Sequence, residues 1–502
     1  RHQKTVFSRN HRFAAPRRVR MHLEACRTKR IQQGTPEAHE RIGKTGDKQE
    51  FFHGAPQAAT RIGGGAKNMF AISAVLMQTS PRRKNRFFLP EKRFVGLHMT
   101  VTGFLFLAMG ILITGIISFR RMLGSRILPW ALFAYHLIFA FYYWFFTLNR
   151  GGDALIYYKK AARGIAEFGT GTQFIDWLMS RLYSIFAGDY LDYYVLFQLF
   201  GFLGFCLLHS ILDEVVFFQK TPRARNFRLA ILFFPNMHFW SSAIGKDSLI
   251  FFAVLLVTWG MIRYQKRLLA IVAGFFLMYF IRPHIAGIFL GAIFMALLWG
   301  PGIPLRWRIT GNLLVVIAIV LLLPQIQKFV GLEEVSVQSV GQYLEKRQGL
   351  NLEGGSSVDI RQYSLPLKIF TFFYRPLFFD ARNINGFVIS MENVFYLWFL
   401  SFLFSGNFLR VLWKYRFSFF MRFNFIAFIT GTFILALSVS NTGIAVRQKN
   451  MFLPGFLILV VTLFAIREYY AAAMTPARAD PGVGGTPAAS GALQVTAKGR
   501  DA

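Results

Sequence analysis

The sequence predicts an all-α fold: a polytopic helical membrane protein with about 11 transmembrane helices, some short or broken, and amphipathic helices at its outer face. Its 502 residues are 54% hydrophobic and 17% aromatic, which is too apolar for a soluble globular chain. Charged residues make up only 16% of the chain and separate apolar runs, several of them close to the roughly 20 residues that cross a bilayer as a helix. The charge of successive loops also alternates, as it does in multi-pass membrane proteins.

Eleven apolar runs are candidate spans. They cover residues 99–118, 127–147, 193–217, 227–241, 247–263, 267–282, 284–299, 308–325, 388–405, 417–439 and 451–467. Several of these runs are shorter than a bilayer requires. The pairs 227–263 and 267–299 are therefore open to a second interpretation, in which each pair is one long, broken or re-entrant unit.

Every second loop between these runs is basic, which is the pattern of cytoplasmic loops. The basic residues are Arg120, Arg121, Arg126, Lys220, Arg223, Arg225, Arg228, Arg263, Lys266, Arg267, Arg306, Arg308, Arg410, Lys414 and Arg416. This pattern places the C-terminus in the cytoplasm and the start of the first span outside. Much of the formal charge of +33 lies in such loops, so we expect the chain to contact a lipid bilayer and no nucleic acid.

The two ends of the chain differ from its middle. Residues 1–98 hold 21 Lys and Arg against 6 Asp and Glu and show no sustained apolar period. We expect them to be a basic, disordered extension, or translated upstream sequence with the start at Met69 or Met99. A start near Met99 agrees with the charge rule, because a basic tail outside would violate it. Residues 99–470 then form the transmembrane domain, with outer loops 149–192 and 326–387, and residues 471–502 form a disordered cytoplasmic tail.

Asp153 is the leading candidate for a catalytic residue. It lies in the stretch 149–158, directly after an apolar run and beside two glycines. A carboxylate at the outer face of a membrane is suited to act as a general base toward a sugar hydroxyl, or to bind a divalent cation. Its other interpretation is structural, as the N-cap of a helix over 154–166. Tyr157 follows on the predicted helix, on one face with Lys160 and Ala161.

Lys246 is the first of several cations expected at the same face. It follows a short span that Pro235 interrupts, within the sequence 234–248. A lysine ammonium is a point charge that suits a phosphate group. For its neighbour Asp247 we favour a structural role, either pairing with Lys246 or capping the next helix.

Arg282 and His284 interrupt an otherwise continuous apolar run, on either side of Pro283. An arginine there must be paired or reach water, because an unpaired charge in hydrocarbon is unfavourable. Arg447, between the last two predicted spans, is a cation on the outer side, against the charge rule, which favours an anionic ligand for it.

The outer loop 326–387 contributes Arg375, whose guanidinium can make two parallel bonds to a phosphate or carboxylate. Glu392, at the start of the following span, is its alternative, purely structural partner. The predicted phosphate- or substrate-binding residues are thus Lys246, Arg282, His284, Arg375, Arg447 and Tyr157.

As an ordered set, these motifs resemble a family of bacterial envelope membrane proteins, the multi-span glycosyltransferases of the C-type fold and related polysaccharide polymerases. The motifs are Gly-Asp-Ala-x-x-Tyr-Tyr at 152–158, Phe-Pro…Phe-Trp-Ser-Ser…Gly-Lys-Asp-Ser at 234–248, Arg-Pro-His at 282–284, Tyr-Arg-Pro at 374–376 and Asn-Thr-Gly…Arg…Pro at 441–454. The resemblance implies that Asp153 is the catalytic or metal-binding carboxylate. The sequence departs from the acidic pair often found in that first outer loop, because the next carboxylates are Glu167 and Asp176.

The resemblance implies sugar transfer from a polyprenyl-phosphate-linked donor to a glycan, lipid or protein acceptor at the outer face of the bacterial inner membrane. A divalent cation is a candidate cofactor, with Asp153 as its ligand. Two other functions stay open at this point. One is a transporter or flippase of an anionic lipid-linked solute, and the other is a non-catalytic subunit of an envelope assembly.

Overall fold

The computed structural model describes residues 98–216, 221–298, 304–331, 336–350, 356–403 and 418–474. Within these ranges the chain is helical, and the one β-type contact is an isolated bridge between Ser357 and Asn441. The prediction of an all-α fold is confirmed for this part of the chain. Of the two compact units, Arg1–Phe88 and Leu89–Ala502, the first lies outside the described residues. So do all but one residue of the predicted extension 1–98 and most of the predicted tail 471–502.

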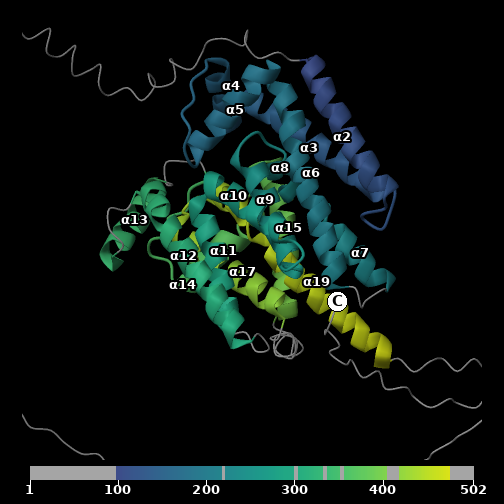
Figure 1. The fold of residues 1–502 in the computed structure, drawn as a ribbon, viewed down its shortest axis with the longest axis vertical. Coiled ribbons are helices and arrows are strands. Elements are labelled where there is room, and N and C mark those ends of the chain that lie inside the picture. Colours follow the sequence, from purple (N-terminus) through teal and green to yellow (C-terminus); the bar gives the residue numbers. More distant parts are fainter. Residues whose placement is uncertain are drawn as a thin grey trace, which may run out of the picture. The chain divides into compact units, whose positions relative to one another are not determined.

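Figure 1 shows the order of the helices along the chain. They are α2 (Val101–Phe119), α3 (Leu128–Arg150), α4 (Asp153–Ala162), α5 (Thr172–Phe186), α6 (Tyr190–Val215), α7 (Pro222–Ile231), α8 (Pro235–Ser241), α9 (Lys246–Ile262), α10 (Leu268–Ile281), α11 (Pro283–Leu298), α12 (Leu305–Val330), α13 (Val337–Leu350), α14 (Leu365–Tyr374), η3 (Phe378–Asp380), α15 (Ile384–Leu403), α17 (Phe419–Ser438), α18 (Thr442–Lys449) and α19 (Leu453–Met474).

Within the described ranges, five helices are long and apolar enough to cross a membrane, namely α2, α3, α6, α12 and α17. A sixth span results if α18 and α19, bent by 61° at their junction, count as one. The predicted number of about 11 is therefore not confirmed. The difference lies mainly in the short runs: α10 has 14 residues, which is roughly 21 Å of helix against a hydrocarbon core of about 30 Å.

Helix breaks occur within both regions, 227–263 and 267–299, for which the sequence leaves a broken or re-entrant unit open. The apolar run 227–241 is divided between α7 and α8, and α8 begins at Pro235, where the missing N–H of proline costs no hydrogen bond. In the same way Arg282 separates α10 from α11, which begins at Pro283.

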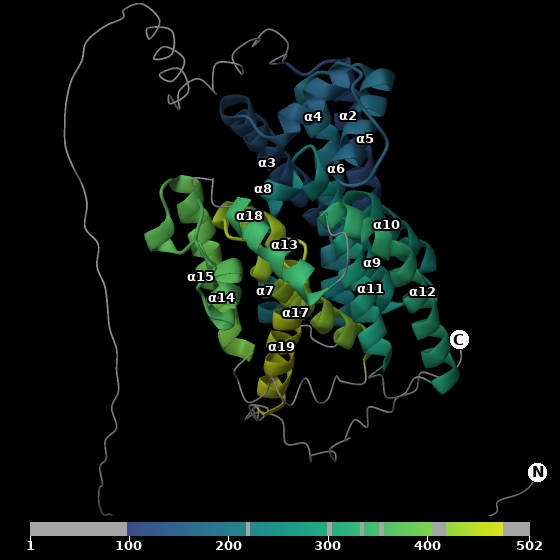
Figure 2. The same ribbon diagram turned by 90° about the vertical axis from the view of Figure 1, so that its left-hand side faces the viewer.

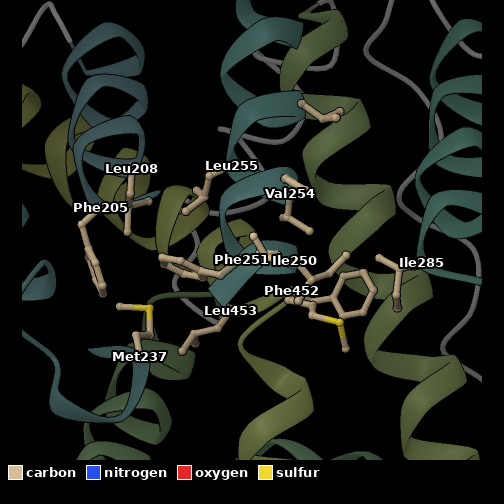
Figure 3. Close-up of a cluster of buried hydrophobic side chains, with 14 of the residues drawn as sticks. Phe205, Leu208, Met237, Ile250, Phe251, Val254, Leu255, Ile285, Phe452 and Leu453 are labelled. Carbon is tan, nitrogen blue, oxygen red and sulfur yellow. The ribbon is translucent and has the colours of Figure 1, made fainter. Parts of the chain in front are cut away.

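Helix α6 is the central helix of the bundle. In its most apolar window 78% of the residues are buried, against 33% for α2 and for α3. Gly204 lets α9 approach closely, since a Cβ atom there would lie 2.7 Å from the ring of Phe251. Figure 3 shows the core that results, in which Phe205 and Leu208 of α6 lie near side chains from α8, α9 and α19. The mostly apolar sequence of α6 is explained by this burial within protein.

Different charged groups lie at the two ends of α9. At its C-terminal end, Arg263 and Arg267 of a predicted cytoplasmic loop bind Glu214, in the last turn of α6, at 3.2 Å and 2.7 Å. At its N-terminal end, α9 starts with Lys246. Figures 1 and 2 show α4 and α5 at the end of the bundle where α3 ends. Asp153 begins α4 and therefore lies at that end too.

Candidate functional site

Asp153 is placed by a sharp turn between two helices. The chain leaves α3 at Arg150 and passes through Gly151 and Gly152, whose φ angles are +75° and +147°. Only glycine adopts such angles without strain. Asp153 is the first residue of α4, with Gly152 as the N-cap. The observed N-cap is therefore one residue earlier than the predicted one, Asp153, whose carboxylate is 55% exposed.

Arg447 of α18 joins this carboxylate to a second one. Its Nη1 donates to Asp153 Oδ2 at 3.0 Å, across 294 residues of sequence. Its Nε donates to Asp247 Oδ2, across 200 residues. One guanidinium therefore bridges the start of α4 and the start of α9, using the fork of donors that lysine lacks.

Asp247 is bound by a second guanidinium. Arg282 Nη2, at the break between α10 and α11, donates to Asp247 Oδ1 at 3.1 Å. Arg282 and Asp247 are both buried. The four residues form a chain, Arg282–Asp247–Arg447–Asp153, which we call the charged chain. The favoured pairing of Asp247 with Lys246 is not what the structure contains, because Asp247 instead neutralises two buried guanidinium groups.

Lys246 lies beside the charged chain and contacts a different helix. Its Nζ donates to Thr172 Oγ1 of α5 at 2.7 Å. Burial, together with the nearby charges of Arg282 and Arg447, lowers the pKa of Lys246 to about 8. His284 lies in the first turn of α11, two residues after Arg282, and is half-buried.

Aromatic rings line the remaining sides. Tyr157 is buried and packs on Gly245, where a Cβ atom would lie 3.0 Å from the tyrosine Cε2. Burial, and then the charge of Asp153, raise the pKa of Tyr157. Trp240 of α8 lies with its ring centroid 5.6 Å from the Arg447 guanidinium carbon, within the range of a cation–π contact. In Figure 2, α8 and α18 lie close together.

The site is graded from buried to exposed. The side chain of Asp247 is 10% exposed, that of Arg447 is 25% exposed and that of Asp153 is 55% exposed. Three cations, with Lys246 included, face two carboxylates, which leaves a formal charge of +1. The positive charge is suited to an anion beside the partly exposed Arg447, and Asp153 is a solvent-accessible carboxylate next to that position.

The sequence also gives Asp153 as a candidate ligand of a divalent cation. Among the residues that the structure describes, no group of three or more His, Cys, Asp or Glu side chains is placed to hold a metal ion. The two site carboxylates instead share Arg447. The second carboxylate sought in the first outer loop is also engaged elsewhere, because Asp176 binds Lys160 at 2.7 Å.

Arg375 is the predicted site residue that the structure places in a separate cluster. Its Nε donates to Asp380 Oδ2 at 2.9 Å, and its Nη2 donates to Oδ1 of the same carboxylate. Hydrogen bonds from Arg375 and the Leu377 N–H help hold the pKa of Asp380 below its usual value. The alternative partner, Glu392, accepts hydrogen bonds from the Asn236 N–H and the Tyr396 hydroxyl instead.

Lys449 and Glu392 are two further buried ionisable residues, of which Lys449 lies on α18, two residues after Arg447. Lys449 is 0% exposed and donates to the Phe373 carbonyl at 3.2 Å and to Asn393 Oδ1. Glu392 is 3% exposed and interacts electrostatically with Lys449. The hydrogen bonds of Lys449, which the sequence does not reveal, fix the end of α18 and with it the position of Arg447.

Replacing either Lys449 or Glu392 alone is expected to destabilise the protein more than replacing both. Lys449→Met should lower the free energy of unfolding by about 3–5 kcal/mol, because Glu392 is left as an uncompensated buried charge. The double variant Lys449→Met/Glu392→Gln should recover much of the loss. Thermal unfolding of the purified variants in one detergent measures this, and equal unfolding temperatures for the wild type and Lys449→Met would contradict it.

No protein-family model, no curated protein and no solved structure matches this chain.

Proposed function

We propose that the protein is a membrane glycosyltransferase that transfers a sugar from a polyprenyl-phosphate-linked donor, in envelope polysaccharide or glycoconjugate synthesis. The proposal places the charged chain at the outer face of the bacterial inner membrane and the C-terminus in the cytoplasm. The observation that carries it is the contact of Arg447 with both Asp153 and Asp247. It sets an exposed carboxylate beside partly buried cations at one end of apolar helices, where a lipid-borne phosphate would meet water.

In this proposal Asp153 is the general base. It takes the proton from an acceptor hydroxyl as the hydroxyl oxygen forms a bond to the anomeric carbon of the donor sugar. The bond between that carbon and the phosphate oxygen breaks, and its electron pair leaves with the polyprenyl phosphate. Arg447 and Lys246 stabilise the negative charge that develops on the phosphate.

The contact between Arg447 and Asp153 adds a substrate-dependent step. An incoming phosphate competes with Asp153 for the guanidinium, because both are anions that accept from the same N–H groups. Binding of the donor then releases Asp153 toward the acceptor. Asp247 keeps Arg447 in place during this exchange through its bond to the Nε atom.

The alkaline limb of the pH profile tests the role of Lys246. Below its folded-state pKa of about 8 the amine is protonated and attracts the donor phosphate, and this attraction is lost as the pH rises through that value. We expect kcat/KM to fall above about pH 8 in the wild type. In Lys246→Arg the fall should move to higher pH, since arginine stays charged. An identical limb in both proteins would remove Lys246 from donor binding.

A transporter or flippase of an anionic lipid-linked solute is the second candidate. The broken helix pairs α7–α8, α10–α11 and α18–α19, together with the buried Lys449 and Glu392, favour it, since such features occur at the substrate sites of transporters. The two candidates differ in what a deletion strain accumulates: donor or truncated units at the outer leaflet for the enzyme, and cargo at the inner leaflet for the transporter.

A further inference from the structure

An apolar groove runs between α3 and α15, next to the charged chain and outside it. Two cavities of about 290 Å³ each make up the groove, and they share the lining residues Tyr142, Ile384 and Asn385. The inner cavity reaches α8 at Pro235 and Phe239. Its size is that of a small-ligand pocket.

The groove changes character along its length. Its inner part is lined mainly by carbon atoms of Phe139, Phe239, Val388 and Ile389. Its outer part ends at Arg150, the last residue of α3, with three asparagine amides around it. These are Asn149, Asn383 and Asn385.

Arg150 is exposed and makes no ion pair with a carboxylate among the residues that the structure describes. Its guanidinium carbon lies 5.3 Å from the centroid of the Phe146 ring, which holds the cation over the mouth of the groove. A ligand complementary to this groove has a hydrocarbon chain at one end and an anion at the other.

The groove also opens sideways. Phe145 and Ile384, on its two walls, are 60% and 77% exposed. Because α3 is one of the helices long enough to cross a membrane, these flanks face the region where lipid chains lie. A lipid can therefore enter from the bilayer without leaving its leaflet.

Two aromatic contacts connect the groove to the charged chain. Phe239, which lines the groove, has its ring centroid 4.3 Å from that of Tyr143. Tyr143 in turn contacts Trp240, 5.6 Å away, and Trp240 lies against Arg447. At the polar end, Arg150 is only three residues before Asp153. An anion held at the mouth of the groove is therefore close to the proposed base.

We infer that the groove between α3 and α15 binds the chain of a polyprenyl phosphate, and that Arg150 at its mouth contacts the phosphate as the lipid enters, before the phosphate reaches Arg447 and Lys246. This inference rests on the proposed function only in naming the lipid as the one that carries the donor sugar. The groove admits the lipid from the side and directs its phosphate toward Arg447.

The test measures binding of polyprenyl phosphate to the purified, detergent-solubilised full chain by native mass spectrometry. Val388→Trp places a bulky ring in the groove, and Val316→Trp on α12 is its matched control, because the two valines are 37% and 41% exposed. We expect Val388→Trp to weaken binding at least tenfold and Val316→Trp to leave it unchanged. Equal binding by both variants would overturn the inference.

A second pair of variants examines the phosphate end without filling the groove. Arg150→Gln should weaken binding of polyprenyl phosphate and leave binding of the uncharged polyprenol unchanged, whereas Arg163→Gln, an exposed cation beyond α4, should change neither. An equal effect of Arg150→Gln on both lipids would overturn the assignment of the phosphate. Displacement of the probe by an equal concentration of phosphatidylglycerol would overturn the polyprenyl chain as the occupant.

Failure of this inference is distinguishable from failure of the proposed function. If Asp153→Asn abolishes sugar transfer while Val388→Trp changes neither lipid binding nor KM, the groove assignment is wrong and the enzyme assignment stands. If the groove variants alter lipid binding as expected but the wild type transfers no sugar, the lipid site stands and the transferase assignment is wrong.

Discussion

Asp153→Asn is expected to lower the rate of sugar transfer by about 100- to 10,000-fold, the contribution of a positioned general base. The amide keeps an oxygen that can accept from Arg447 Nη1, so the ion pair is weakened and the local fold is preserved. KM for the donor should fall, because Arg447 and Lys246 still face the phosphate and the amide competes for Arg447 less strongly than the Asp153 carboxylate does. Transfer rates measured in isolated membranes, normalised to the amount of protein, test this expectation.

The control for Asp153→Asn is Asp359→Asn. Asp359 is also an exposed aspartate paired with an arginine, at 2.6 Å from Arg361, and none of its contacts reaches the charged chain. Its substitution should leave transfer at the wild-type rate. Full activity in Asp153→Asn would remove that carboxylate from the mechanism, and equal losses in both variants would indicate a general effect of outer-face charge.

Asp247→Ala is expected to have the largest effect on stability. It removes the carboxylate between Arg282 and Arg447 and leaves two guanidinium groups close together without it. Breaking one buried ion pair typically lowers the free energy of unfolding by about 3–5 kcal/mol, and here one substitution breaks two. Thermal unfolding in detergent should show a large decrease in the unfolding temperature of Asp247→Ala and little change in that of Asp359→Ala.

A second variant tests whether the loss of stability in Asp247→Ala comes from repulsion between Arg282 and Arg447 or from lost packing at position 247. In Asp247→Ala/Arg282→Met the unbalanced charge of Arg282 is gone, so part of the lost stability should return. A double variant less stable than Asp247→Ala would show that the charges are not the cause.

The class of the fold is predictable from the sequence, and the number of spans is not. Long apolar runs such as the one that becomes α6 form helices wherever backbone groups have no water to bond. The run that becomes α10 is more apolar still but has only 14 residues, and its length alone does not reveal whether it crosses a membrane or packs beside α9 within the bundle. That outcome depends on tertiary contacts, such as Gly260 and Gly274 bringing α9 and α10 together.

The sequence predicts which residues lie in the candidate site better than it predicts the ion pairs between them. The loop-charge pattern groups Asp153, Lys246, Arg282 and Arg447 on one face, and the contacts of the structure bring these four residues together. The same pattern includes Arg375, because the local sequence does not reveal that Asp380, five residues later, will occupy its guanidinium.

Asp247 is the residue whose importance the sequence understated. The signal was present, since an aspartate in the first turn of a strongly apolar helix needs a buried partner. Its neighbour Lys246 was the obvious partner in sequence, but adjacent residues on a helix point in different directions. The true partners, Arg282 and Arg447, are 35 and 200 residues away.

The lipid-linked glycan profile of a deletion strain tests the transferase assignment most directly. We predict accumulation of the lipid-linked donor, or of truncated repeat units, accessible from the outer side of the membrane, with restoration by the wild-type chain and none by Asp153→Asn at equal protein level. An unchanged profile, or accumulation confined to the inner leaflet, would contradict the account.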